Sequence, residues 1–586
     1  MLGSTAAPPP SLHPLPADAS NVGVPPSLPS PSLTVTALPS APALAPVPDA
    51  PPAPSPVPAA ARAPVPAATP AAVRAARPSQ DAEDGSRIAP LAERNSSPCR
   101  QDDNSHGDEE VRYAGPDLPE EIWHHIYSLV PMRDAARAAC VSHAFHHSWR
   151  CHPNLTLIKE TICSQENLRH WTGDANDKRD RREYNNNIDQ ILANHRGTDV
   201  KALELDFYGP YNTKSYNRLN SWLQIAVTPG IEELKLLLLS DKSKYDFPCS
   251  LLSDRGNTIR YLSLDHCALH PTVSLGLGCL TQLELYEVRI TGDELVRLIS
   301  NSFALEKLKL TYCDDIIRLE IPCLVQRLSY LKVFECSSLQ VIENKAPNMS
   351  SFDYSGRQVP FSLGESRQVM KKLRLFHGCV INYAINKLPS SVPNLETLTL
   401  RSPIEIVNAP MVPNKFLHLK KLNISISKWS SDREYDFLSL ASFLDASPSL
   451  ELFVLSVSAV SKYDLVVGDP SSLRQMPVQP HDKLKTVKIV GFCPQKSLVE
   501  LTRHILECAT SLKFLVLDTI NVYYRCSGDI SGRKCSTLNR ARVREVFKSI
   551  VAVKVYIEEK VPSTVLLDVR EPCKRCHILS ELWRSS

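Results

Sequence analysis

The chain has 586 residues, enough for several domains, and its 66 basic and 63 acidic residues give a formal net charge of +3. This near-balance argues against a nucleic-acid partner, and the absence of any run of about 18 apolar residues argues against a membrane span. The 17 cysteines form an odd number without a secretory signal, which indicates reduced thiols rather than a disulfide framework.

The first 112 residues have the composition of a disordered tail. Residues 1–80 hold 22 of the 47 prolines among alanine, serine and valine, with almost no aromatic residues. Such a segment cannot bury enough apolar surface to offset its ordering entropy, and residues 81–112 continue as a polar, acidic linker. Because the start is rich in alanine and serine and poor in acids, a plastid transit peptide is an alternative interpretation.

Residues 113–155 predict a small domain of three short helices. Asp117 caps the first helix and Pro131 ends it, while 133–140 and 142–149 form the second and third. Four apolar residues at spacings of four, four and three lie on one face of the first helix: Leu118, Ile122, Ile126 and Leu129. About 40 residues without a disulfide or metal rarely fold alone, so this face must be covered by the rest of the chain or by another protein.

The order and spacing of these residues resemble an F-box. That family docks on the Skp adaptor of a cullin–RING ubiquitin ligase, and the resemblance implies adaptor contacts at nine positions: Leu118, Pro119, Ile122, Ile126, Leu129, Pro131, Val141, Phe145 and Trp149. Phe145 stands where a tryptophan is common. Four alanines replace the usual leucines of the second helix: Ala135, Ala136, Ala138 and Ala139. The alternative is that these helices only cap the repeats that follow.

One phrase, apolar-x-x-apolar-x-apolar, recurs thirteen times at a mean spacing of 26 residues over the range 200–539. A period of about 20–29 residues with this phrase is the leucine-rich-repeat signature. The copies begin at Val200, Ile231, Ile259, Leu280, Leu305, Leu328, Met349, Met370, Leu395, Leu419, Leu450, Leu484 and Leu512. Each phrase predicts a short strand whose apolar face only stacked neighbours can bury, so the expected fold is an α/β leucine-rich-repeat solenoid, or horseshoe.

The segments between and beside the strands complete this fold. Thr291 and Glu294 form a capping-box pattern that begins a helix, and 436–448 predicts another. Residues 156–199 are expected to be a helical spacer, and 540–586 are expected to cap the open end of the solenoid. Five cysteines lie three or four residues after their phrase, where a small apolar side chain packs well in the turn out of the strand: Cys267, Cys313, Cys336, Cys379 and Cys493.

The stretch 483–518 resembles the C-terminal repeats of plant F-box/leucine-rich-repeat proteins, including those with an FBD-type tail. With the F-box, the resemblance spans about 115–560. It implies a non-catalytic substrate receptor of an SCF-type E3 ubiquitin ligase in the nucleus, the cytoplasm or both. Its partners are a Skp-type adaptor, the cullin and RING subunits beyond it, and an unidentified target protein. Two alternatives remain: a repeat scaffold without a ligase link, and a hormone-type receptor in which a small ligand helps to bind the target.

The sequence contains no persuasive catalytic, cofactor or metal pattern. CKRCH (573–577) matches haem-attachment spacing, but that chemistry needs an export route. Four cysteines could be zinc ligands only with a poor nine-residue spacing in one pair: Cys526, Cys535, Cys573 and Cys576. We therefore expect no catalytic residue, no metal and no cofactor, apart from a bound polyphosphate as an alternative.

The third and fifth positions of each phrase point outward, because side chains alternate along a strand. In the middle and later repeats these positions form a group of cations: Lys307, Lys309, Lys332, Lys372, Arg374 and Lys421. Earlier repeats place Glu204, Glu233 and Glu284 there instead, with Lys235 as the exception. We expect this cationic group either to be an ordinary solvated face or to bind an acidic or phosphorylated segment of the target.

Overall fold

The computed structural model describes residues 119–140, 148–163, 178–196, 200–209, 212–238, 245–271, 275–405, 408–409, 414–427, 435–458, 465–520 and 540–572. The chain divides into two units, Met1–Glu109 and Glu110–Ser586, and all described residues belong to the second. The predicted disorder of 1–112 therefore concerns residues outside the described part. The same is true of Asp117, the haem-like stretch and the four cysteines considered for zinc.

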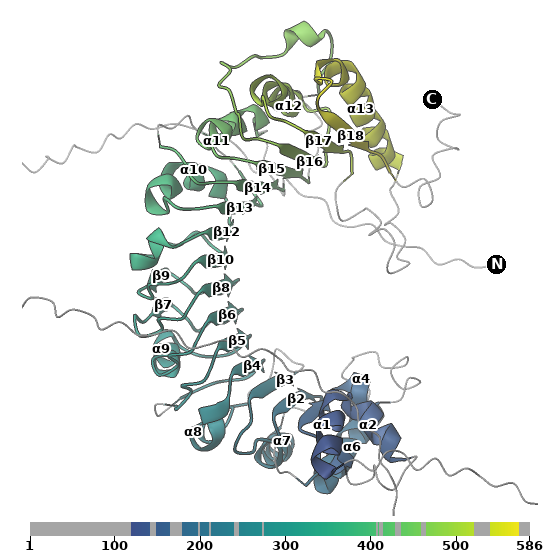
Figure 1. Cartoon of the computed structure of the whole chain (residues 1–586), viewed down its shortest axis with the longest axis vertical. Helices are drawn as coiled ribbons and strands as arrows, with labels where there is room; N and C mark the ends of the chain where they lie inside the picture. The colour runs from purple at the N-terminus through teal and green to yellow at the C-terminus, as the bar shows by residue number, and fades with distance from the viewer. Residues whose placement is uncertain are drawn as a thin grey trace, which may run out of the picture. The chain divides into compact units, whose positions relative to one another are not determined.

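One parallel sheet of 15 strands runs through the described part of the chain, with neighbours paired in the order β1-β2-β3-β4-β5-β6-β8-β10-β12-β13-β14-β15-β16-β17-β18. Figure 1 shows these strands side by side along the inner side of a curve. Their bounds are β1 (Asn154–Leu157), β2 (Ala202–Phe207), β3 (Glu233–Leu238), β4 (Tyr261–Asp265), β5 (Gln282–Tyr286), β6 (Lys307–Thr311), β8 (Tyr330–Phe334), β10 (Ser351–Ser355), β12 (Lys372–Phe376), β13 (Thr397–Ser402), β14 (Lys421–Ile426), β15 (Leu452–Val457), β16 (Thr486–Val490), β17 (Phe514–Asp518) and β18 (Leu566–Arg570).

The thirteen predicted strands are confirmed. Each begins two residues after the first apolar residue of its phrase, as β6 does after Leu305. In β6, Leu308 and Leu310 are fully buried while Lys307 and Lys309 face outward, as the alternation predicted. Burying one such leucine stabilises the fold by about 1.5–3 kcal/mol, so each repeat depends on its neighbours for stability.

Two further strands, β1 and β18, extend the predicted repeats at both ends. β1 pairs with β2, and it lies across the boundary between the expected F-box and the expected helical spacer. β18 pairs with β17, so the expected C-terminal cap contributes a strand of its own. Neither strand was predicted, because in each case the residue two positions before the strand is polar. The first position of the phrase, apolar in all thirteen copies, is His152 before β1 and Thr564 before β18.

The outer layer is helical towards both ends of the sheet (Figure 1). Its helices are α6 (Lys178–Asn194), α7 (Thr213–Ala226), α8 (Ser250–Arg255), α9 (Gly292–Ile299), α10 (Val380–Ser391), α11 (Ala441–Asp445), α12 (Lys496–Cys508) and α13 (Arg540–Tyr556). Single 3-10 turns occur at η2 (Gly256–Thr258), η3 (Gly364–Gln368), η4 (Phe437–Leu440), η5 (Pro470–Ser472) and η7 (Glu558–Lys560). In the repeats of β6, β8 and β10 a second sheet replaces the helices, in the order β11 (Phe361–Ser362), β9 (Val341–Asn344) and β7 (Arg318–Ile321).

Several local predictions hold. Thr291 and Glu294 form both hydrogen bonds of a capping box at the start of α9, and the helix predicted over 436–448 is present as η4 followed by α11. Four of the five phrase cysteines are buried: Cys267, Cys313, Cys336 and Cys493. Burial raises the pKa of the Cys493 thiol to about 11, so this side chain is neutral at pH 7. Cys379 is the exception, because it is half-buried with φ +56° just before α10.

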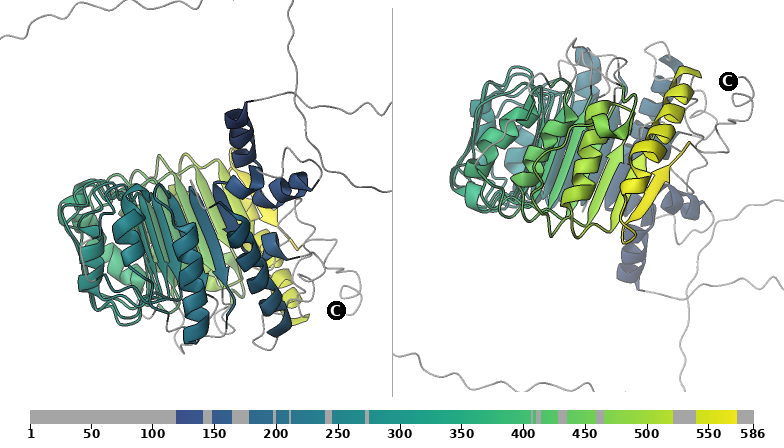
Figure 2. Two further views of the ribbon diagram at one scale, coloured as in Figure 1. Left: turned by 90° about the horizontal axis from the view of Figure 1, so that it is seen from below. Right: turned by 90° about the horizontal axis from the view of Figure 1, so that it is seen from above.

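The predicted F-box forms α1 (Glu120–Leu129), α2 (Met132–Ala139) and η1 (Ser148–Cys151), followed by α4 (Lys159–Ile162). α2 begins one residue earlier than expected. Of the third predicted helix, 142–149, the structure describes only the last two residues, which form the start of η1. Figure 2 shows α1, at the dark end of the colour scale, standing away from the sheet.

Candidate functional site

The first candidate surface is the apolar face of α1. Leu129 is 73% exposed and Ile122 is 46% exposed, whereas Ile126 is half-buried. Pro119 is exposed just before the helix, and Leu118 lies outside the described residues. Two large apolar side chains are therefore left open to solvent on one helix, which is the situation predicted for a face that another protein covers.

α1 is nevertheless fastened to the first repeat. The ring Nε2 of His152 lies 3.0 Å from the carbonyl oxygen of Val130, and the side-chain amide of Asn154 donates to the carbonyl of Ser128 at 3.2 Å. Arg133 of α2 donates to the carbonyl of Glu160 in α4 at 3.0 Å. These bonds join the end of α1 and the start of α2 to β1 and α4, so they orient the exposed face relative to the repeats.

The other predicted adaptor residues are divided between exposed and inner positions. Pro131 is exposed at the start of α2, while Trp149 is half-buried in η1. Val141 and Phe145 lie outside the described residues. Of the four alanines, Ala135 is fully buried, and Ala136 and Ala139 line a pocket. The structure therefore places much of the alanine-rich face of α2 against the first repeat rather than beside Ile122 and Leu129.

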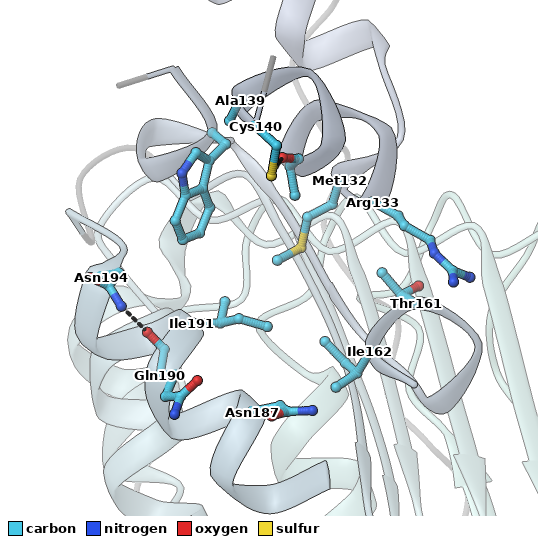
Figure 3. Close-up of a pocket in the computed structure, with 12 residues that line it drawn as sticks. Met132, Arg133, Ala139, Cys140, Thr161, Ile162, Asn187, Gln190, Ile191 and Asn194 are labelled. Carbon is cyan, nitrogen blue, oxygen red and sulfur yellow. Dashed lines mark hydrogen bonds between the residues drawn. The ribbon is translucent and has the colours of Figure 1, made fainter. Parts of the chain in front are cut away.

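Figure 3 shows this pocket, which has a volume of about 460 Å³. Its walls come from α2, Trp149 of η1, α4 and α6, with Met132 and Ile191 among the apolar residues and Asn187, Gln190 and Asn194 at one side. Ala136 and Ala139 contribute only methyl groups to its wall. The pocket lies between the F-box helices and α6, not on the inner face of the sheet.

The second candidate surface is the predicted cationic group on the inner face. The register brings Lys309 directly beside Lys332, but Asp353 of β10 separates Lys332 from Arg374. In the neighbouring row, Tyr330 and Ser351 lie between Lys307 and Lys372. Thr397 separates Lys372 from Lys421. The six cations therefore share one face without forming an unbroken run.

Two of these cations are paired with carboxylates. Lys309 Nζ lies 2.7 Å from Glu284 Oε1, and Arg374 Nε lies 3.2 Å from Asp353 Oδ1. Partial burial alone would raise the pKa of Glu284, but hydrogen bonds from Lys309 and Gln282 lower it, so the carboxylate remains ionised. Lys307 and Lys372 are exposed and form no ion pair with any described residue. Lys421 of β14 is likewise exposed and has no ion pair with a described residue, so these three lysines are the cations of the group most available to a ligand.

Sequence reasoning missed several neighbours of this group. Arg401 adds a cation at the seventh position of its phrase, with its guanidinium carbon 5.5 Å from the centre of the Phe376 ring. Lys332 Nζ lies 5.3 Å from the centre of the Phe334 ring. The seventh position also points outward by alternation, so extending the same count by two residues would have found Phe334, Phe376 and Arg401.

Within the described ranges, no cluster of three His, Cys, Asp or Glu side chains is placed to hold a metal ion. No described helix is long and apolar enough to cross a membrane.

Comparison with known families gives two matches. The model described as F-box domain matches residues 116–156, and the one described as At1g61320/AtMIF1, LRR domain matches residues 191–574. The second match alone covers more than half of the chain. The chain belongs to this leucine-rich-repeat family. The order of the two matches, F-box first and repeats after it, is the one predicted from the sequence.

The relatives of this F-box/leucine-rich-repeat chain include several proteins of the plant Arabidopsis thaliana. It is 22% identical to F-box/FBD/LRR-repeat protein At3g26920 over 69% of the chain and 89% of that protein. It is 24% identical to F-box/LRR-repeat protein At5g02910 and 20% identical to F-box protein At5g03100, in each case over 35% of the chain. The chain spans 40% and 58% of the lengths of these last two proteins. The predicted plant F-box/leucine-rich-repeat family is confirmed.

Proposed function

We propose that this chain is the substrate receptor of an SCF-type (Skp–cullin–F-box) E3 ubiquitin ligase, acting in the nucleus, the cytoplasm or both. The F-box binds a Skp-type adaptor and, through it, the cullin and RING subunits. The repeats bind the target protein. The observation that carries the proposal is the exposed apolar face of α1, formed by Ile122 and Leu129, in a segment that matches the F-box domain.

The role is non-catalytic. Ubiquitin transfer belongs to other subunits, and this chain raises the effective concentration of the target beside them by holding two partners together. The hydrogen bonds from His152 and Asn154 to the end of α1 support this role, because they give the adaptor-binding face a defined orientation on the repeats.

Co-purification of the full chain with a Skp-type adaptor tests the proposal. Leu129→Asp and Ile126→Asp should each weaken adaptor binding at least tenfold, because burying an unpaired carboxylate in an apolar contact costs several kcal/mol. Val467→Asp is the matched control, since Val467 is an 82% exposed apolar residue on another segment. Wild-type adaptor binding by folded Leu129→Asp protein, judged by circular dichroism, would refute the proposed docking face.

For the target we propose an acidic or phosphorylated segment that binds the cationic group. The exposed Lys307 and Lys372, with Arg374 as a bidentate donor, support this proposal. A bound polyphosphate would use the same chemistry, so inorganic polyphosphate should compete with an acidic target segment for these residues. Reversing Lys309 and Arg374 is a poorer test than reversing Lys307 and Lys372, because it also breaks the pairs with Glu284 and Asp353.

The two alternative functions make different demands. A scaffold without a ligase link predicts no adaptor binding in the experiment above. A small-ligand receptor needs a pocket where the target binds. In the described part of the chain, one pocket of about 460 Å³ lies between α2 and α6, and another of about 430 Å³ is lined by Glu343 and Ser362 of the second sheet. We therefore favour direct target binding by the inner face.

A further inference from the structure

A row of aromatic rings follows the carboxyl ends of four neighbouring strands, β4, β5, β6 and β8. We call this the aromatic row; its members are His266, Tyr286, Tyr312 and Phe334. Successive ring centres lie 5.5, 5.5 and 5.6 Å apart, and the last two contacts are edge-to-face. Tyr286 is 38% exposed and Tyr312 is 37% exposed, so the rings stay in contact with one another while remaining open to solvent.

The backbone of the same repeats is held in an unusual conformation. Four of the five non-glycine residues with positive φ in the described ranges come directly after these four strands: His266, Glu287, Tyr312 and Glu335, with φ between +48° and +54°. Each of their amides donates to a carbonyl of the next repeat, at distances of 2.7–2.9 Å. Residues with a Cβ rarely adopt this region, and such strain persists where the surroundings enforce it, often at binding sites.

The aromatic row is not needed to fill the core. The core beneath it is built from the fully buried leucines of the same strands, such as Leu308 and Leu310. Exposed tyrosines in fixed positions bury a large area on binding and lose little conformational entropy, which makes them frequent energetic centres of protein interfaces. The row therefore has the properties of a preformed contact surface.

The charges around the aromatic row are unequal at its two ends. At the β4–β5 end, His266 contacts Asp265 and lies 2.9 Å from Glu287 Oε2. At the β8 end, Lys332 lies over Phe334, and the carboxylate of Glu335 accepts a hydrogen bond from Ser355. The exposed Arg401 of β13 is in the same row of the register as Phe334. A ligand that covers both rings and cations must combine apolar side chains with negative charge at one end.

Resting on the proposed function, we propose that the aromatic row and the cations beside it bind an extended target segment in which apolar or aromatic side chains are followed by carboxylates. The apolar part contacts Tyr286, Tyr312 and Phe334. The carboxylates contact Lys332 and Arg401. From β5 to β13 there are five strand spacings of about 4.8 Å, or about 24 Å, which matches about seven extended residues.

The proposed binding surface can be tested without knowledge of the target. A library of displayed random peptides, each about twelve residues long, is selected for binding to the full chain. Enriched peptides should carry apolar residues followed by Asp or Glu. Binding of the best enriched peptide should weaken at least tenfold in the double variant Tyr286→Ala with Tyr312→Asn, because both rings are removed. Asparagine is chosen at 312 because it tolerates φ near +54°. Phe514→Ala is the matched control, since Phe514 is 46% exposed on distant β17 of the same sheet.

The inference would be overturned if no peptide were enriched, or if the enriched peptides lacked apolar residues followed by Asp or Glu. It would also be overturned if the best enriched peptide bound the wild type and the double variant with equal affinity while the two proteins had the same melting temperature. The test is independent of the ligase proposal. Leu129→Asp protein should lose adaptor binding but bind the peptide normally. In the wild type, failed adaptor binding with retained peptide binding would refute the proposed function alone. Failed peptide binding with intact adaptor binding refutes this inference alone.

Discussion

Glu500 has a side chain that is completely shielded from solvent, and it accepts hydrogen bonds from the backbone amide of Arg474 at 2.9 Å and from its Nε at 2.8 Å. The same guanidinium donates to both carboxylate oxygens of Asp436, at 2.8 and 2.9 Å. Arg474 therefore fastens the long connection between β15 and β16 to the start of η4 and to α12.

Arg474→Met should destabilise the fold by about 3–5 kcal/mol, because it leaves the buried Glu500 carboxylate without a counter-charge. Adding Glu500→Gln should recover part of this loss, since a neutral amide needs no cation. Urea unfolding followed by circular dichroism measures both effects. A loss below about 1 kcal/mol in the single variant would contradict this account of the cluster.

Gly491 follows β16 with φ +75°, and a Cβ at this position would lie 2.0 Å from the carbonyl oxygen of Val457. Gly491→Ala should therefore cost at least about 2 kcal/mol, because backbone strain and the steric clash add. Gly278→Ala is the control, since a Cβ there meets nothing within 4 Å. Equal melting temperatures for the two variants would show that the backbone around Gly491 relaxes freely.

The charge reversals Lys307→Glu and Lys372→Glu together should weaken binding of fluorescent polyglutamate to the full chain at least tenfold. Both lysines are exposed and unpaired among the described residues, so their charges act on the ligand directly. Fluorescence anisotropy at low salt measures the effect, and added salt should reduce wild-type binding. Reversal of Lys483, an exposed lysine paired with Asp482 outside the group, is the control. Equal losses in both proteins would indicate only a general charge effect.

His504 of α12 should make the fold sensitive to acid. Burial lowers its pKa below the ordinary value, and the facing groups are Asp445, His481 and Glu507. Since the folded state resists protonation, the unfolded state binds more protons as pH falls below about 6.5, and stability is lost there. His504→Gln should lose less stability than wild type between pH 7 and 5, measured by urea unfolding. Parallel pH curves for the two proteins would exclude His504 as a contributor.

Much of the fold could be predicted because one phrase recurs at a fixed period. Alternation along each phrase located thirteen strands and their buried positions. The two terminal strands escaped because His152 and Thr564 stand where the phrase requires an apolar residue. The second sheet also escaped, since β7, β9 and β11 are only two to four residues long and lack a pattern of their own.

The charged site was predicted only in part. Alternation correctly placed Lys307 and Lys372 on the outward side of their strands, but it did not indicate which charges cancel. The pairing of Lys309 with Glu284 depends on the register between β5 and β6. The positive φ angle of Tyr312 accompanies a hydrogen bond from its amide to the next repeat. No local sequence pattern predicts that conformation.

The second sheet also determines how straight the inner face is. Packed helices lie about 8–10 Å apart and paired strands about 4.8 Å, so a layer of helices outside a sheet makes the sheet bend. Where β7, β9 and β11 replace the helices, the outer layer is itself a sheet, so its strands have the same spacing as those of the inner sheet. The sheet should therefore be flattest from β6 to β12, a distance of about 14 Å. Over that distance about four residues of an extended ligand can lie straight. Each successive repeat of the protein would then contact the next part of the ligand.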